Sequence, residues 1–288
     1  MTQEMYSIKD NQLIMQDAEL GLNLTLSFSL PMLPQDISGG KVLQNGHLLV
    51  IERDEQKVLR AAYLACDGKR HGQCRLFYPD GSIEAEMYYQ MDKLHGPSMF
   101  YGENGEVLSR TFFCEGKREG KVYFYYLSGR VSSVQRYKDG LWHGVQEYFY
   151  EDGSIKSLLP YSHGKLHGEV RLFWDGGKNK RTTHYAMGLR DGKDQIWNEK
   201  GTLVDDAEYR SGQPCGKHCH YFASGKPKEE ITYHAPTRFD KKEWNEEGKL
   251  IVEGTWSSDM SYTEKSYLES HGARVRKGYW DGNKLCWK

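Results

Sequence analysis

The sequence predicts an all-β protein, an elongated and twisted antiparallel array of 24-residue β-hairpin repeats with a cap at each end. Three observations lead to this prediction. The 288 residues include 20 Tyr, 10 Phe, 7 Trp and 31 Gly, and a composition rich in aromatic residues and glycine is typical of strands joined by frequent turns. Glycines recur at a constant interval, and aromatic residues recur with the same period. A fixed period of this length indicates a repeat architecture.

Two series of glycines define the repeat unit. The first series has one glycine in each of seven units, at Gly72, Gly96, Gly120, Gly144, Gly168, Gly192 and Gly216. The second series follows nine residues behind the first, at Gly81, Gly105, Gly129, Gly153, Gly177, Gly201 and Gly225. Glycine adopts the positive φ that tight turns need, and pairs such as Asp80-Gly81 are typical of hairpin turns. We therefore expect a turn at each glycine, and hence one hairpin in each unit.

Two aromatic series share this period. The first lies five residues after each first-series glycine, at Phe77, Tyr101, Tyr125, Phe149, Phe173, Trp197 and Tyr221. The second lies seventeen residues after it, at Tyr89, Phe113, Tyr137, Tyr161, Tyr185, Tyr209 and Tyr233. Position eleven, occupied by Ile83 in the first unit, has the same parity. If the turn preserves facing, positions five, eleven and seventeen all lie on one face of the sheet, which would be the core face.

The array is predicted to cover residues 61–256. This range includes half a unit before Gly72 and an eighth unit that has Phe239 in the glycine position. Residues 1–60 lack the period, but alternating leucines from Leu20 to Leu30 predict a half-buried strand, and Asn45-Gly46 predicts a hairpin. This region is either an N-terminal cap, which we favour, or a separate small β domain. Residues 257–288 are predicted to form a C-terminal cap or tail, because end units must cover open sheet edges.

A recurring string of five residues resembles the MORN repeat, in its bacterial variant form. It occurs at residues 68–72, 92–96 and 164–168, where lysine and histidine precede the repeat glycine, and an aromatic pair and Asp-Gly or Asn-Gly follow. Pro227 and Asn179 depart from the pattern at the aliphatic position eleven. The resemblance implies a sheet of hairpins that serves in protein–protein or membrane-associated scaffolding, with an antitoxin-like or immunity role in some bacterial relatives. Some MORN proteins also carry a methyltransferase or lipid kinase domain, and the remaining segments here match neither.

The composition and motifs indicate no catalytic residue, no metal ligand and no cofactor. The net charge of −1 provides no field that would steer the chain to nucleic acid or to an anionic bilayer. No nucleophile elbow, phosphate-binding loop or zinc-protease motif occurs. The absence of an apolar leader or membrane span, together with six cysteines in no dense framework, favours a cytoplasmic protein, although delivery into another cell by a specialised secretion system would leave no mark.

Three polar groups have a structural interpretation. Histidines precede the repeat glycine at His71, His95, His143 and His167. Successive repeat units lie about 9 to 10 Å apart in a sheet, whereas each ligand of one zinc ion lies about 2 Å from it. Histidines of successive units therefore do not share a zinc ion, and a turn role is favoured.

The cluster from Cys215 to His220 places His218 and His220 on one strand face and Cys219 on the other. The basic runs at 178–181 and at Arg274, Arg276 and Lys277 are expected to be solvent-exposed, with membrane lipid as the alternative partner.

The even positions of each first strand are apolar too, and this second apolar face is the candidate partner surface. The predicted partner-binding residues are Phe100, Phe124, Tyr126, Tyr148, Tyr150, Leu172 and Trp174. This face either packs under a cap or across a twisted sheet, or forms an open groove for a partner. The sequence thus predicts a non-enzymatic protein-binding scaffold, with an antitoxin, immunity or secreted-effector role as a special case. The alternative is an enzyme or lipid-associated protein whose function lies in the non-repeat ends.

Overall fold

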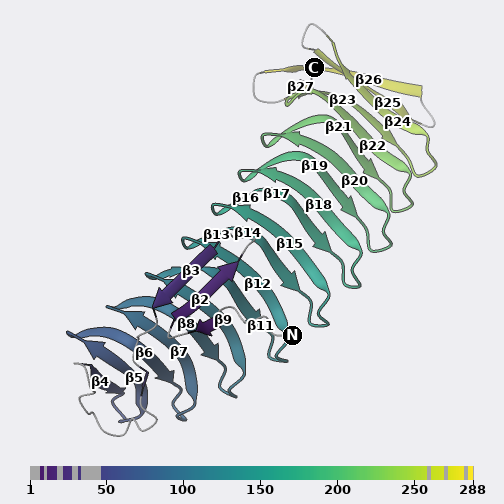
Figure 1. Ribbon diagram of the computed structural model, residues 1–288. Coiled ribbons are helices and arrows are strands. Elements are labelled where there is room, and N and C mark those ends of the chain that lie inside the picture. The colour runs from purple at the N-terminus through teal and green to yellow at the C-terminus, as the bar shows by residue number, and fades with distance from the viewer. Residues whose placement is uncertain are drawn as a thin grey trace. The chain divides into compact units, whose positions relative to one another are not determined.

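The computed structural model describes residues 7–9, 12–17, 22–27, 32–33, 47–257, 261–268, 272–281 and 285–287, and every helix or strand in these ranges is a β-strand (Figure 1). The all-β prediction is therefore confirmed. The chain divides into two compact units. Unit 1 comprises residues 1–155 and 161–164, and unit 2 comprises residues 156–160 and 165–288.

Three strands before the array form a small antiparallel sheet. They are β1 (Ser7–Lys9), β2 (Gln12–Asp17) and β3 (Leu22–Ser27), paired in chain order. The strand predicted from the alternating leucines is β3. The turn predicted at Asn45-Gly46 lies outside the described residues. The division of the chain into a cap, an array and a tail stays a prediction.

The remaining strands of unit 1 pair antiparallel in chain order. They are β4 (Leu48–Arg53), β5 (Leu59–Cys66), β6 (Lys69–Phe77), β7 (Ile83–Gln90), β8 (Lys93–Tyr101), β9 (Val107–Cys114), β10 (Lys117–Arg118), β11 (Gly120–Tyr125), β12 (Val131–Lys138), β13 (Leu141–Trp142) and β14 (Gly144–Phe149). The next strand, β15 (Ile155–Ser162), is divided between the two units.

The strands of unit 2 repeat the same pattern. They are β16 (Lys165–Leu166), β17 (Gly168–Phe173), β18 (Asn179–Ala186), β19 (Leu189–Trp197), β20 (Leu203–Arg210), β21 (Gln213–Tyr221), β22 (Pro227–Ala235), β23 (Arg238–Trp244), β24 (Leu250–Trp256), β25 (Ser261–Leu268), β26 (Gly272–Trp280) and β27 (Leu285–Trp287). Trp244 pairs with Leu250 beyond a bulge, so the eighth unit with Phe239 in place of glycine still forms a hairpin. The prediction of one hairpin per repeat unit is confirmed.

All fourteen repeat glycines have positive φ, but only one series lies in a turn. The second series closes the predicted turn, since Gly81 N donates a hydrogen bond of 2.9 Å to Tyr78 O. The first series lies at or near irregularities of the strands, such as the register shift between Tyr63 and Ala65 opposite Gly72. The other turn precedes it, for example at Glu115-Gly116, where φ is 48° and 81°. Two successive positive φ values are the requirement of a type I′ hairpin turn, so the prediction that this turn lies at the first-series glycine was wrong.

The strand register corrects the predicted core face. Tyr89 lies opposite Gly72, whereas Phe77 lies opposite Ile83 beyond a bulge between Leu76 and Phe77. Directly opposite residues share a face, and the extra residue of a bulge changes the facing of the residues after it. Phe77 and Ile83 accordingly pack in one cluster and Tyr89 in another. The prediction that positions five, eleven and seventeen share one face is therefore wrong.

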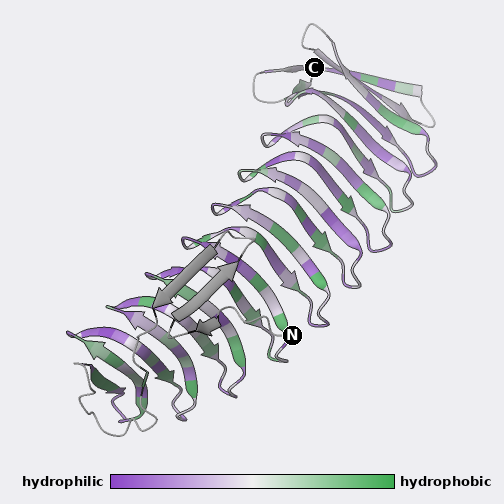
Figure 2. Ribbon diagram, in the orientation of Figure 1, coloured by the Kyte–Doolittle hydropathy of each residue, from purple (hydrophilic) through white to green (hydrophobic). Residues whose placement is uncertain are grey.

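The two faces of the array are both apolar at this end of unit 1. The tyrosine face, as we call it, carries positions two, four, thirteen, fifteen and seventeen of each unit, which in the first unit are Cys74, Leu76, Ala85, Met87 and Tyr89. On the opposite face, Leu33 is buried in the cluster of Phe77, and its N–H donates a 3.0 Å hydrogen bond to Gln73 Oε1. Figure 2 shows hydrophobic and hydrophilic segments alternating along the strands of both units.

Candidate functional site

In each of the two compact units, a row of side chains crosses the strands on the tyrosine face. These side chains occupy positions four and thirteen of successive repeats. We call this row the lateral row. In unit 1 it consists of Leu76, Ala85, Phe100, Ser109, Phe124, Ser133 and Tyr148. In unit 2 it consists of Ser157, Leu172, Arg181, Ile196, Asp205, His220, Glu229 and Glu243. The fold thus brings together residues that are 9 to 15 positions apart in the chain.

In unit 1 the lateral row alternates large and small side chains. Ser109 is directly opposite both Phe100 and Phe124, and Ser133 is directly opposite both Phe124 and Tyr148. The two serines are buried, while Phe100 is 38% exposed and the other two rings are half-buried. Burial raises the pKa of the Tyr148 hydroxyl. The arrangement is a strip of aromatic rings, accessible to solvent, over a floor of small residues.

In unit 2 the same row carries charge. Asp205 Oδ2 lies 2.6 Å from His220 Nδ1, and His220 Nε2 lies 3.5 Å from Glu229 Oε2. Lys241 Nζ lies 2.9 Å from Glu229 Oε1 and also contacts the carboxylate of Glu243. Burial raises the pKa of Asp205, and the nearby His220 offsets this only in part. Charged residues, Arg181, Asp205 and Glu229, therefore take the places that the serines have in unit 1.

A second ion pair supports this part of the face. Arg181 Nη2 lies 2.6 Å from Asp194 Oδ2, and Arg190 Nη1 lies 3.2 Å from the same oxygen. Burial alone would raise the pKa of Asp194, but hydrogen bonds from Arg181 and Thr183 outweigh it, so the pKa is lowered. The buried carboxylate is thus stabilised in its charged form.

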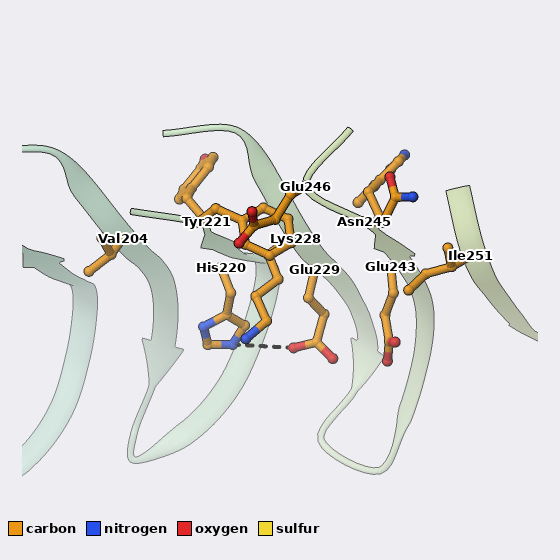
Figure 3. A pocket seen from close by; sticks show the side chains of 11 residues that line it. Val204, His220, Tyr221, Lys228, Glu229, Glu243, Asn245, Glu246 and Ile251 are labelled. Carbon is orange, nitrogen blue, oxygen red and sulfur yellow. Dashed lines mark ion pairs between the residues drawn. The ribbon is translucent and has the colours of Figure 1, made fainter. Parts of the chain in front are cut away.

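A cavity of about 800 Å³ opens beside this charged row (Figure 3). His220, Glu229 and Glu243 extend into it side by side from β21, β22 and β23, with Lys228 among them. Aromatic residues line it as well, namely Tyr221, Phe222 and Trp244. Within the described ranges no three His, Cys, Asp or Glu side chains are placed to hold a metal ion. The cavity offers paired charges and aromatic surface for a polar ligand or side chain.

The structure divides the predicted partner-binding residues into two groups. Phe100, Phe124, Tyr148 and Leu172 belong to the lateral row. The position-six residues Tyr126, Tyr150 and Trp174 lie instead at the turn that follows the first strand.

The position-six side chains link neighbouring repeats. Tyr126 Oη donates a 2.7 Å hydrogen bond to Phe149 O, and Trp174 Nε1 donates one of 3.0 Å to Trp197 O. Tyr78 makes the same contact with Tyr101 O at 2.9 Å. These residues therefore have a structural role that the sequence analysis did not foresee.

Sequence reasoning also missed the members of the row at position thirteen. The series is Ala85, Ser109, Ser133, Ser157, Arg181, Asp205 and Glu229. Along this series the residues are small in the first four repeats and charged in the last three. This change was the signal that could have identified both the aromatic strip of unit 1 and the charged part of the lateral row in unit 2. It was overlooked because neither type of residue stands out by itself.

The histidines occupy separate environments. His95 is buried, with Nδ1 3.4 Å from Glu115 Oε1, and burial lowers its pKa despite this carboxylate. His143 contacts the ring of His163 at a centroid distance of 5.2 Å. His218 packs between the rings of Tyr209 and Tyr233 on the tyrosine face, and its Nε2 lies 2.7 Å from Glu208 O. Packing and backbone contacts thus account for these rings.

Comparison with protein families gives three matches along the array. Residues 70–91, 142–163 and 214–235 each match the MORN repeat variant. The chain contains MORN repeats of the variant type. Successive matched segments start three repeat periods apart, so every third MORN unit is matched and the intervening units share its register. A comparison with curated proteins gives no match.

MORN repeats suggest a scaffold, often one that binds protein or lipid. The part of the chain that the structure describes has no helix with the length and apolarity needed to cross a membrane.

Proposed function

We propose that this MORN array is a non-enzymatic scaffold that binds a partner protein through the lateral row of unit 1. The observation that carries the proposal is the strip of Phe100, Phe124 and Tyr148 over buried Ser109 and Ser133. Binding energy at protein interfaces is concentrated in a few residues, with aromatic residues prominent among them. Rings that are half-buried before binding are also held in place, so little side-chain freedom is lost when a partner covers them.

The chemistry of the strip favours binding over catalysis. Its polar atoms are the hydroxyls of Ser109, Ser133 and Tyr148, and burial raises the pKa of the last. A general base or nucleophile needs a partner that activates it, and the lateral row of unit 1 supplies only small, aliphatic and aromatic neighbours. An antitoxin, immunity or secreted-effector role would be a special case, in which the bound partner is a toxin or a host protein.

Affinity capture with variants of the full chain tests the proposal. The double variant Phe100→Ala/Phe124→Ala should retain less than a tenth of the partner that the wild-type chain captures from its native cell. Leu127→Ala is the matched control, because Leu127 is 77% exposed at a turn away from the row. The control should capture as much as the wild type. Equal capture by all three proteins, each with an unchanged melting temperature, would rule out the strip as the docking surface.

A further inference from the structure

One turn edge of unit 2 carries two copies of the same arrangement of cations and aromatic rings. In the first copy, Lys180 Nζ lies 4.2 Å from the ring centre of Trp174. In the second, Lys228 Nζ lies 5.9 Å from the ring centre of Phe222. Lysine at position twelve thus rests on the aromatic residue at position six in both repeats. Attraction between an ammonium and the face of an aromatic ring holds the cation in place.

A second lysine fixes each copy to the next repeat. Lys178 Nζ donates a 3.3 Å hydrogen bond to Glu199 O, and Lys226 Nζ donates one of 3.0 Å to Glu246 O. Each copy therefore has two ammonium groups held near the turn. Because these cations are positioned before any ligand arrives, binding an anion costs less side-chain entropy than it would at free surface lysines.

This edge has an excess of positive charge although the whole chain has a net charge of −1. The position-six to position-twelve segments of the three repeats are residues 174–180, 198–204 and 222–228. They contain five lysines against two carboxylates, and the next turn, residues 245–251, adds Lys249 against Glu246 and Glu247, so the edge has an excess of two positive charges. In the described part of unit 2, no carboxylate forms an ion pair with Lys180 or Lys228. Both ammonium groups are thus available to an external anion.

The spacing of the two copies indicates the shape of the ligand. Trp174 and Phe222 are two repeat units apart, and two units correspond to two hairpins or four strands. At about 4.8 Å per strand, the separation is roughly 19 Å. An extended polypeptide rises about 3.3 Å per residue, so roughly six residues cover this distance.

We propose that this turn edge docks an extended acidic segment of the partner, with two carboxylate clusters about six residues apart. The proposal rests on the proposed function, because it assumes that the partner is a protein, and it adds a second contact of different chemistry from the aromatic strip. Lys228 also lines the cavity beside His220 and Glu229 (Figure 3). A side chain that follows the second carboxylate cluster can therefore enter this cavity.

Fluorescence anisotropy with labelled peptides tests the proposal on the full chain. One 12-residue peptide carries two Glu-Glu pairs six residues apart, and a second peptide of the same composition carries the four glutamates in one run. The spaced peptide should bind at least fivefold more tightly. Lys180→Gln/Lys228→Gln should weaken its binding at least tenfold. Lys69→Gln/Lys165→Gln removes the same charge from exposed lysines near the other turn edge, and it should change the affinity less than twofold.

Four results would overturn the proposal. Equal affinity for the two peptides would remove the spacing argument, and equal loss in both double variants would show a non-specific charge effect. Binding of the chain to phosphatidylserine vesicles, lost in Lys180→Gln/Lys228→Gln and accompanied by no peptide binding, would assign the edge to lipid. Capture of the native partner by that variant at the wild-type level would reject this edge and leave the aromatic strip of unit 1 as the docking surface.

Discussion

At the scale of single residues, Gly192 shows why a glycine is needed where each repeat's strand changes register. Its φ is 115°, and a Cβ added to it would lie 3.0 Å from His184 Cβ. The turn glycine Gly201 has a φ of 90° but no heavy atom within 4 Å of an added Cβ. Both positions are strained for other residues, and only the first also lacks space.

We expect Gly192→Ala to destabilise the protein by about 1–3 kcal/mol through its backbone conformation, with a further loss from the contact with His184. Gly201→Ala should show the backbone effect alone and therefore unfold at a higher urea concentration than Gly192→Ala. Denaturation curves of the two variants and the wild type measure this difference. Identical midpoints for the two variants would mean that the strand beside Gly192 shifts to accommodate a methyl group.

Two aspartates of unit 2 should respond to pH in opposite ways. The pKa of Asp194 is lowered from 3.8, so its charge stabilises the folded state above about pH 4, and this contribution is lost as the pH falls through the folded-state pKa. The pKa of Asp205 is raised from 3.8, so its charge costs stability at neutral pH. This cost disappears once the pH is low enough to protonate the carboxyl in both states.

Asp194→Asn should therefore destabilise the protein at pH 7, with the difference from wild type shrinking below pH 4. Asp205→Asn should leave the stability at pH 7 unchanged or raise it. Melting temperatures of both variants between pH 3 and pH 7 test the two signs. A large destabilisation by Asp205→Asn at pH 7 would show that its pairing with His220 outweighs the cost of burial.

At the scale of the hairpin, neighbouring repeats are connected by side-chain donors as well as by strand pairing. Tyr126 and Trp174 each donate to a carbonyl oxygen of the next repeat. Glycine N–H groups of the type I′ turns do the same along the other edge, as Gly116 N does to Leu94 O at 2.8 Å. Each of these hairpins is thus held at both ends by the one beside it.

Tyr126→Phe should destabilise the array by about 0.5–1.5 kcal/mol, since it removes one hydrogen bond and keeps the ring. Tyr126→Ala should cost more because the ring packing is lost as well. Tyr185→Phe is the control, because no hydrogen bond of its hydroxyl occurs in the described part of unit 2. Chemical denaturation compares the three. A stability of Tyr126→Phe equal to that of the control would mean that water replaces the lost donor at no cost.

The period of the hairpins could be predicted from sequence, whereas their facing could not. A recurring glycine such as Gly81 or Gly72 predicts a positive φ, because other residues rarely adopt one. The φ of both residues is positive. The assignment of odd and even positions to opposite faces, in contrast, requires strands without bulges. The bulge between Leu76 and Phe77 changes which face the later residues point to. Phe124 and Tyr126 therefore appeared to belong to one surface, although one joins the lateral row and the other a turn. A single added residue changes the facing of the residues after it, and because both faces are apolar here, the hydrophobic pattern does not record the change.

At the scale of the whole molecule, the two compact units carry different types of side chain on the tyrosine face. The row of unit 1 ends in Phe124 and Tyr148, and that of unit 2 contains Asp205, His220 and Glu229. Contacts between exposed charges weaken with salt, whereas apolar contacts do not. The elongation expected from the repeat stays a prediction, which a radius of gyration well above the compact value of about 19 Å would support.

Salt should therefore distinguish the two proposed contacts with the partner. For Phe100→Ala/Phe124→Ala, the remaining affinity should fall at least tenfold between 50 and 500 mM NaCl, because it depends on the lysines. For Lys180→Gln/Lys228→Gln, it should change less than threefold. Titrations with the purified partner at each salt concentration measure both. The same salt dependence in the two variants would mean that the contacts are not chemically distinct.

The bulge of the hairpins also limits how such a chain can change its length. It recurs at the same position of the repeat, as between Phe124 and Tyr125 and between Leu172 and Phe173. Inserting half a repeat, which is one strand, would exchange the two faces of every later strand and expose one apolar side. Inserting a whole repeat, which is one hairpin, would leave the register of every strand pair intact. Gain or loss of whole hairpins is thus the route by which such an array can lengthen or shorten while each face keeps its side chains.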